Sequence, residues 1–162
     1  MSDVGERITA SVMLADYAAQ ETGKLHVIGG GLQFLGFDPN MGVTAPFTVI
    51  VSLTSPTAIT TDHPAVEIVL VDAGGDPVGL PGPAGPQVMR ISQNVEMPEP
   101  ALPGQSLPKG SINASATFVL HFATGLPIPP GLSYSWRVQI DHDVKATYPF
   151  FIPGPPQGPV LG

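Results

Sequence analysis

The step Gly23-Lys24 is the feature of this sequence that comes nearest to a phosphate-binding loop. A Walker loop would cradle phosphates with backbone N–H groups, and it needs a glycine five residues before the Gly-Lys pair and a Ser or Thr directly after it. Those two places hold Ala18 and Leu25. The spacing therefore excludes a nucleotide-binding loop of this type.

The triplet Gly29–Gly31 raises the possibility of a dinucleotide-binding turn. That fingerprint needs glycines at its first, third and sixth places, followed by a helix. Counted from Gly31, the third place is Gln33, and the following residues have a strand-like pattern. We therefore interpret 14–37 as a β-hairpin followed by a glycine bend, with Ala18–Lys24 in the turn and at most one turn of helix there. Asp16 is expected to face inward and to accept N–H bonds from that turn.

Metal-ligating residue types are present but scattered. A zinc site needs three or four converging ligands, and no spacing in this sequence forces the histidines together, so we interpret them as solvated or singly hydrogen-bonded. Calcium prefers six or more oxygen ligands, and loop tips of a β-sandwich often gather at one end. The histidines are His26, His63, His121 and His142, and the weak calcium candidates are Asp141, Asp143, Asp72 and Asp76.

Hydrolytic chemistry finds little support in the residue pattern. Ser106 is followed by Pro108, where a nucleophile elbow has its second glycine. Glu96 and Glu99 could form a glycosidase-like carboxylate pair, although an acidic strand end explains them more simply. Asn113 begins a glycosylation sequon. No nucleophile, base and orienting group can be assembled, so an enzyme is the least favoured class and no catalytic residue or cofactor is predicted.

Composition limits the possible partners. The chain has 162 residues, the size of one domain, with 6 Lys and Arg against 13 Asp and Glu and a net charge of −7. Nucleic acids and anionic membranes both attract clustered cations, so neither is an expected partner. The absence of cysteine excludes disulfides and thiolate sites. We also expect no signal peptide or membrane span, and hence a cytoplasmic location or incorporation into a particle.

The charge content is unusually low for a folded chain. Charged residues make up 12% of the sequence, against about 25% in an ordinary soluble domain. Glycine and proline are abundant, at 19 and 20 residues, yet Val, Ile, Leu and Thr are frequent as well. Disordered chains lack such residues. The composition therefore predicts a folded domain whose surface is short of charge.

The elements expected to position these residues are strands. Apolar residues alternate with polar ones, as in half-buried strands, and Trp136 falls on an inward face while Pro149 marks a sheet edge or bulge. The pattern predicts about nine strands in an all-β, two-sheet antiparallel sandwich of immunoglobulin-like or C2-like type. The alternating segments outside the hairpin are 7–16, 47–54, 66–72, 87–97, 113–122, 132–141 and 146–152.

Proline- and glycine-rich stretches interrupt this pattern. We predict a polyproline-type loop at 75–86 and a long exposed connection at 97–110. The domain organisation follows as an N-terminal arm at 1–6, a sandwich at 7–152 and a tail at 153–162.

Two motifs carry a family resemblance. "LADYA…GKLHVIGGG" near the start, with "GLSYSWRVQIDHDVKATYPFFI" near the end, resembles a family of small uncharacterised bacterial proteins found in actinobacteria and their phages. The likeness covers most of residues 7–152. It implies a β-sandwich fold, and it implies no activity, ligand or catalytic residue.

The favoured function is a non-enzymatic structural or protein-interaction module. Outward positions of the predicted strands hold mainly Ser, Thr, Val, Gln and Ala, where an isolated sandwich normally carries charges. Such a surface predicts self-association or a protein partner in a larger assembly, with a phage or virion coat accessory as a special case. The alternative is a carbohydrate- or calcium-binding module that uses loops at one end of the sandwich.

Overall fold

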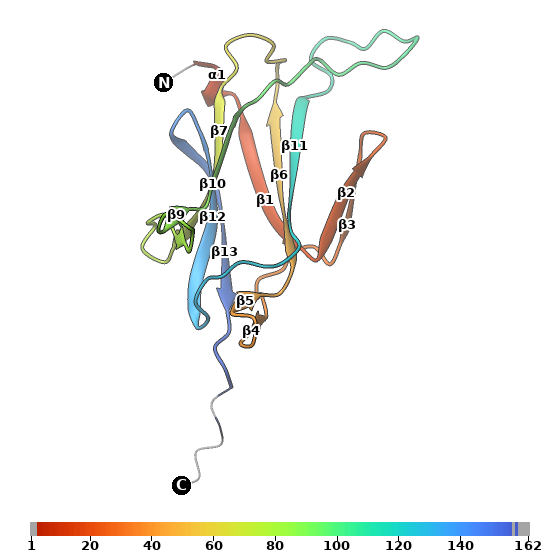
Figure 1. The fold of residues 1–162 in the computed structure, drawn as a ribbon. Coiled ribbons are helices and arrows are strands. Elements are labelled where there is room, and N and C mark those ends of the chain that lie inside the picture. The colour runs from red at the N-terminus through yellow and green to blue at the C-terminus, as the bar shows by residue number, and fades with distance from the viewer. Residues whose placement is uncertain (1–2, 157, 159–162) are drawn as a thin grey trace.

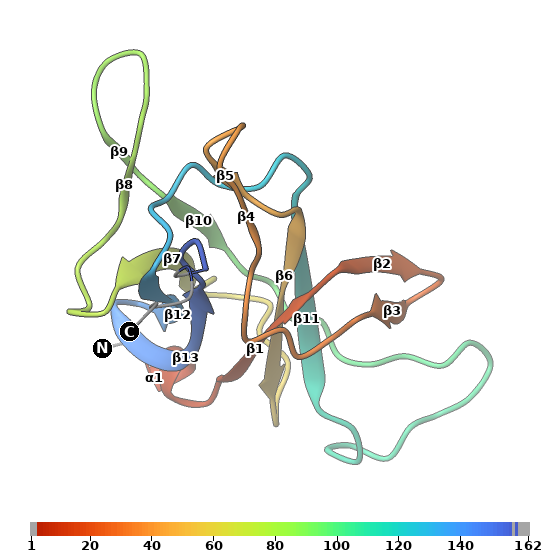
Figure 2. The same ribbon diagram turned by 90° about the horizontal axis from the view of Figure 1, so that it is seen from below.

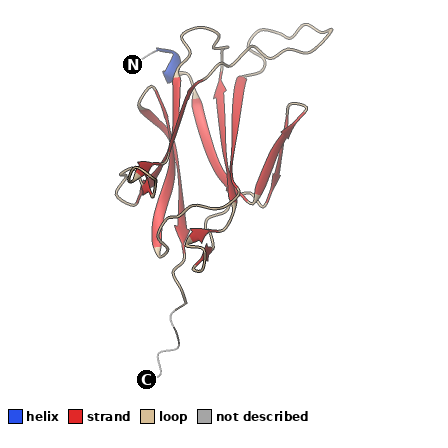
Figure 3. Ribbon diagram, in the orientation of Figure 1, coloured by secondary structure: helices blue, strands red, loops and turns tan. Residues whose placement is uncertain are grey.

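The computed structural model describes residues 3–156 and 158, and its regular structure is almost entirely β (Figures 1 and 3). Two antiparallel sheets face each other across one core, as predicted. The three-stranded sheet has the order β1-β6-β11, and the four-stranded sheet has the order β10-β7-β12-β13. Their strands are β1 (Thr9–Ala15), β6 (Phe47–Ser55), β11 (Ala114–Phe122), β7 (Ala65–Asp72), β10 (Arg90–Asn94), β12 (Leu132–Ile140) and β13 (Asp143–Ile152).

The strand order is of the immunoglobulin-like kind. Taken along the chain, the first, second and fifth of the seven sandwich strands form one sheet, and the third, fourth, sixth and seventh form the other. An immunoglobulin sandwich groups its strands in the same way, apart from the fourth strand, which here joins the second sheet. Of the two predicted types, the immunoglobulin-like one is therefore confirmed.

Smaller elements decorate the sandwich. The hairpin β2 (Tyr17–Glu21) and β3 (Lys24–Ile28) brings the strands of five or more residues to nine within the described chain, the number predicted. Two-residue ladders add β4 (Phe37–Asp38) with β5 (Val43–Thr44) and β8 (Gly79–Leu80) with β9 (Gln87–Val88). A single helical turn, α1 (Asp3–Glu6), lies in the N-terminal arm, where the sequence pattern gave no sign of it.

The core lies between the two sheets and is centred on Trp136, which is fully buried. Phe122 of β11 packs against Trp136 of β12 with ring centroids 5.3 Å apart, and Phe47 of β6 stacks on Phe122 at 4.8 Å. Rings from both sheets therefore meet at one point. Aromatic packing of this kind contributes about 0.5–1.5 kcal/mol per pair beyond the area buried.

Period-two alternation correctly predicts which side chains enter this core. Val49, Val51 and Leu53 of β6 are fully buried between the sheets, and their alternates point away from the core. Several positions depart from the pattern; Val69 and Val71 of β7, for example, alternate with core residues yet are buried. Leu132 was expected to face inward but is half exposed, because it begins β12 at the end of its sheet. Ile50 faces outward yet is buried, because the β2–β3 hairpin covers it.

Residues 31–35 form a strap between the two sheets on the side where β1 lies next to β13. The N–H groups of Gly31 and Leu32 donate to the Leu14 carbonyl of β1, at 2.8 and 3.0 Å. Further along the strap, Leu35 donates to the Phe151 carbonyl of β13 at 3.0 Å. The glycine triplet thus provides the bend that lets the chain come back close to β1, as interpreted from the sequence.

The turn of the first hairpin was placed incorrectly. Residues expected to form a turn or a helical turn, Ala18 to Glu21, are strand β2, and only Thr22 and Gly23 lie between β2 and β3. Alanine, glutamine and glutamate favour helix locally, but the cross-strand pairing with β3 overrides that preference. Asp16 is also exposed instead of inward, because the chain leaves β1 at Ala15.

The proline-rich stretches lie at the surface. Residues 75–86 do not form a simple polyproline loop, since they contribute β8 to a short hairpin with β9. The connection 97–110 is largely exposed, as predicted, and projects on the same side as the β2–β3 hairpin (Figure 2). Residues 153–156 of the tail line an apolar pocket of about 430 Å³ with Phe37, Pro39 and Pro130. The prediction for the rest of the tail lies outside the described residues, apart from Gly158.

Candidate interaction surface

The outer face of the three-stranded sheet is built from rows of residues that lie side by side across its strands. Because side chains alternate along a strand, every second residue of β1, β6 and β11 points to this face. Two of the rows carry only hydroxyl side chains, one is apolar, and the last is mixed. They are Thr9–Thr54–Ser115, Ser11–Ser52–Thr117, Met13–Ile50–Val119 and Ala15–Thr48–His121.

None of these outward positions holds Asp, Glu, Lys or Arg. The outer face of the four-stranded sheet is different. There Arg90 lies 3.7 Å from the Glu67 carboxylate, and the Arg137 guanidinium donates to the Gly75 carbonyl. The charge deficit predicted from composition is therefore concentrated on one sheet. We call these rows of the three-stranded sheet the neutral face.

The base of the β2–β3 hairpin covers the apolar row of the neutral face. Ala18 is fully buried against Ile50 and Ala15, and Met13 and Val119 pack on the same cluster. Beyond this base the hairpin leaves the sandwich (Figures 1 and 2), and every residue of β3 is exposed. A lone two-stranded hairpin has marginal stability in water, so its attachment depends on this small cluster.

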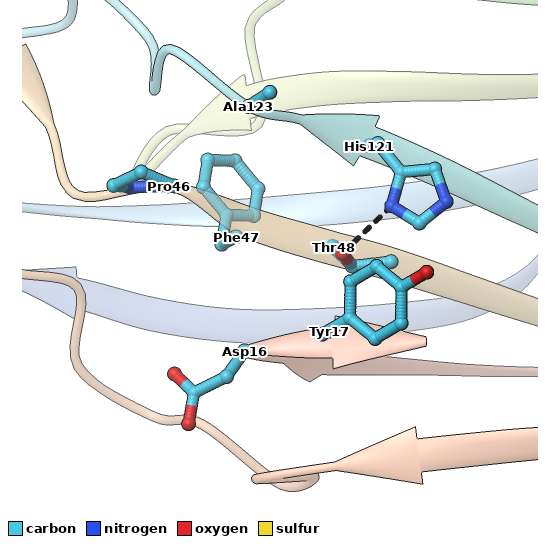
Figure 4. Close-up of a pocket in the computed structure, with 7 residues that line it drawn as sticks. All are labelled: Asp16, Tyr17, Pro46, Phe47, Thr48, His121 and Ala123. Atoms are coloured by element: carbon cyan, nitrogen blue, oxygen red, sulfur yellow. Dashed lines mark hydrogen bonds between the residues drawn. The ribbon is translucent and has the colours of Figure 1, made fainter. Parts of the chain in front are cut away.

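A shallow pocket of about 410 Å³ lies where the hairpin leaves the sheet (Figure 4). The Tyr17 ring stacks on His121, with centroids 5.6 Å apart and planes 25° apart. The imidazole Nδ1 also lies 3.2 Å from the hydroxyl of Thr48, a buried residue. These contacts fix His121 as a link between the hairpin and the sheet.

The pocket has only part of what hydrolytic chemistry would need. A nucleophile requires a base, and the base requires a third group to orient it. Thr48 and His121 could supply the first two roles, but Asp16 at the pocket's rim points away from the imidazole (Figure 4). The geometry suits packing of the hairpin better than it suits proton transfer.

The calcium candidates are separated by the length of a strand. Asp72 lies opposite Tyr134, whereas Asp141 follows Ile140 at the other end of β12. Six residues of strand between these points correspond to about 20 Å, so the expectation that the two loops gather at one end is wrong. The Asp141 carboxylate accepts the Ala65 N–H at 3.0 Å, and the Asp72 carboxylate accepts N–H groups of its own turn. The Asp143 carboxylate forms an ion pair with the Lys145 ammonium.

The remaining predicted site residues stay apart. Within residues 3–156 and 158, no group of three or more His, Asp or Glu side chains is arranged to hold a metal ion. His26 and His121 lie in strands and His63 lies in a loop, as predicted, and His142 lies in the β12–β13 turn, 3.8 Å from Glu67. The other candidates are exposed, namely Glu96, Glu99, Ser106 and Asn113.

Tyr134 lies two residues before Trp136, so alternation places it on the same inward face, and it is buried there. Its hydroxyl donates to the Pro129 carbonyl at 2.8 Å, five residues earlier. This is the tyrosine corner of immunoglobulin-like sandwiches, which fixes the connection into the sixth strand. Burial, and to a smaller extent the Asp72 carboxylate, raises the pKa of the Tyr134 phenol above its ordinary value of 10.0. The sequence signal for this hydrogen bond was a tyrosine two residues after the start of the predicted strand 132–141.

No family model matches the chain, and no curated protein matches it significantly. The chain is similar to the CooA pilin subunit from enterotoxigenic Escherichia coli, with 13% identity, a TM-score of 0.30, and coverage of 89% of this chain and 94% of the pilin. At this TM-score the likeness is confined to a β-rich fold. The resemblance to actinobacterial and phage sandwich proteins stays a prediction.

The described residues include no helix that is long and apolar enough to cross a membrane.

Proposed function

We propose that this protein is a non-enzymatic structural subunit that associates with further copies of itself. The observation that carries the proposal is the neutral face, whose outward residues include no Asp, Glu, Lys or Arg. Soluble sandwiches usually protect exposed sheets and edges with charges. A sheet whose outward face and outer strand lack such charges is better explained as one that contacts another subunit.

Electrostatics favours the same region for contact between copies. The chain carries a net charge of −7, so two copies repel each other when they approach through their acidic loops. Approach through the neutral face brings no carboxylates of its strands together. The charge distribution thus permits association on one side of the sandwich and opposes it elsewhere.

The hairpin adds apolar surface beside this face. Ile28 is 64% exposed and Tyr17 is 52% exposed, and Leu25 and Val27 are also partly open to solvent. Apolar groups at the centre of an interface supply most of its binding free energy. The combination of a neutral sheet with an apolar projecting hairpin suits a contact between subunits.

Sedimentation velocity over a dilution series from high to low micromolar concentration tests the proposal. We expect a concentration-dependent equilibrium between the monomer and a larger species. Association should persist at high salt, because a neutral interface depends little on ion pairs. A single monomeric species at every concentration would contradict self-association.

A further inference from the structure

Three of the four outer strands in the two sheets have some protection against pairing with another chain. The strap at 31–35 bonds to both β1 and β13, and β13 also contains Pro149, which cannot donate to a ladder. The third, β10, is only five residues long and carries Arg90. Short strands, charges, proline and covering loops are the usual devices that block edge pairing.

Strand β11 lacks these devices in its own sequence, and the β2–β3 hairpin contacts it through the outward side chains of Val119 and His121. It runs for nine residues, Ala114–Phe122, and contains neither proline nor Asp, Glu, Lys or Arg. It pairs with β6 on one side and with no strand on the other, among the residues that the structure describes. A long, neutral and unpaired edge is the feature that most favours addition of another strand.

Side-chain burial also indicates an incomplete sheet at this edge. The core-facing residues of the neighbouring strand β6, such as Val49 and Val51, are fully buried. Phe118 and Leu120 of β11 face the same core but are only half buried. A further strand beside β11 would cover the apolar area that these two side chains leave open.

We propose that β11 pairs antiparallel with β11 of a second copy about a two-fold axis. The two three-stranded sheets would then form one continuous sheet with the order β1-β6-β11-β11-β6-β1. This inference rests on the proposed self-association and assigns the surface through which it occurs. A two-fold contact uses the same patch on both subunits, which requires that the strand be complementary to itself.

The sequence of β11 meets that requirement. Full-length antiparallel pairing places Phe118 opposite its own copy at the centre of the strand. On the neutral face Thr117 then lies opposite Val119 of the second copy, and Ser115 lies opposite His121. On the core side Ala116 lies opposite Leu120. No like charges oppose each other, and small residues face larger ones, as favourable cross-strand pairs require.

Two lysine substitutions in the same row of the sheet test this assignment. Thr117 of β11 and Ser11 of β1 both pair in register with Ser52 and point to the same face. Thr117→Lys places a charge beside the proposed axis, whereas the matched control Ser11→Lys places it two strands away. We expect Thr117→Lys to raise the dissociation constant by about tenfold or more, because the symmetric contact meets the change twice.

Spin labels provide a second test that leaves the surface neutral. The chain contains no cysteine, so Thr117→Cys and Ser11→Cys each carry a unique label. In the proposed pair the two Thr117 positions are diagonal neighbours about 7–8 Å apart. The two Ser11 positions are separated by five strand spacings, about 24 Å. Continuous-wave electron paramagnetic resonance should therefore show strong dipolar broadening, and hence a shorter distance, for the β11 label and little broadening for the β1 label.

The outcomes separate this inference from the proposed function. Weaker association of Thr117→Lys alone, with the shorter β11 label distance, would support the β11 contact. Equal weakening of self-association by both lysines would indicate docking through the whole face. No weakening by either lysine would indicate contact through another surface. Both results would overturn the β11 contact while self-association stands. A monomeric wild-type protein would overturn both proposals. If Thr117→Lys does not fold, the label distances still decide.

Discussion

Tyr17 stacks on His121 with ring centroids 5.6 Å apart, and this contact joins the first residue of the hairpin to the end of the edge strand β11. His121 in turn contacts the Thr48 hydroxyl on the central strand β6. The ring pair therefore sets where the hairpin leaves the neutral face. Since the remainder of the hairpin is largely exposed, its orientation depends on a few contacts at its base.

Removing the Tyr17 ring should release the hairpin without unfolding the sandwich. Tyr17→Ala loses a stack worth about 0.5–1.5 kcal/mol, and we expect faster hydrogen exchange for the amides of β2 and β3 with little change for those of β6. Tyr17→Phe keeps the ring and serves as the control. Equal exchange in Tyr17→Ala and the wild type would show that the stack does not hold the hairpin.

Gly125 occupies a backbone position that no other residue can fill without displacement. Its φ is +68°, and a Cβ there would overlap the carbonyl oxygen of Thr44, whose hydroxyl accepts the Leu126 N–H at 3.0 Å. Gly125→Ala should lower the free energy of unfolding by more than about 2 kcal/mol. Denaturant unfolding followed by the fluorescence of the single tryptophan, Trp136, measures this loss.

Gly104→Ala separates the steric overlap from the backbone cost. Gly104 has a similar φ of +73°, but nothing lies within 4 Å of a Cβ built there. Only the left-handed backbone conformation is then penalised, at about 1–2 kcal/mol. A Gly125→Ala loss no larger than that of Gly104→Ala would contradict the role of the Thr44 carbonyl.

The sandwich itself could be predicted because alternation in strands such as β6 and β12 is a local property of the sequence. Core positions including Trp136 and Val51 follow directly from that period of two. The strand order depends on which segments pair across long stretches of chain, and no local pattern records it. The separation of Asp72 from Asp141 by a strand's length is a consequence of that order and could not be foreseen.

The neutral face was predictable in composition but not in position. Alternation within each strand indicates that its outward positions hold mainly small neutral residues such as Ser and Thr. Only the pairing of β1 with β6 and of β6 with β11 places these residues in one surface. The hairpin was harder, since the helix-favouring residues at Ala18–Glu21 become a strand through partners in β3 that lie beyond the turn.

Tyr134 should make stability fall at alkaline pH. Burial raises the pKa of its phenol in the folded state above 10.0, so the folded protein favours the protonated form. This contribution is fully present below the unfolded pKa of about 10 and is lost as pH rises through the folded value. Chemical denaturation at a series of pH values up to 11 should show this decline.

The control for that decline is Tyr134→Phe, which has no ionisable group. It loses the hydrogen bond to Pro129, and we expect it to be less stable at neutral pH by about 0.5–1.5 kcal/mol. Its stability should fall less steeply than that of the wild type above pH 10. Identical slopes for the two proteins would show that Tyr134 does not cause the alkaline loss.

Thr22 is the strained residue of the β2–β3 turn, and replacing it should stabilise the hairpin. Thr22 and Gly23 have φ values of +47° and +73°, the signature of a two-residue type I′ turn. A β-branched residue is poorly suited to positive φ, whereas Asn-Gly is the favoured pair for this turn. Thr22→Asn should therefore slow hydrogen exchange of the β3 amides by about fivefold, corresponding to about 1 kcal/mol.

Thr22→Val distinguishes relief of backbone strain from a general effect of substitution at this site. Valine keeps the branched Cβ and replaces the hydroxyl with a methyl group, so the unfavourable positive φ persists and no slowing of β3 exchange is expected. Since the hairpin is held to the neutral face by a small cluster around Ala18 and Ile50, its local opening should respond to the turn while the sandwich amides of β6 do not. Equal exchange in Thr22→Asn and Thr22→Val would mean that the turn does not limit the stability of the hairpin.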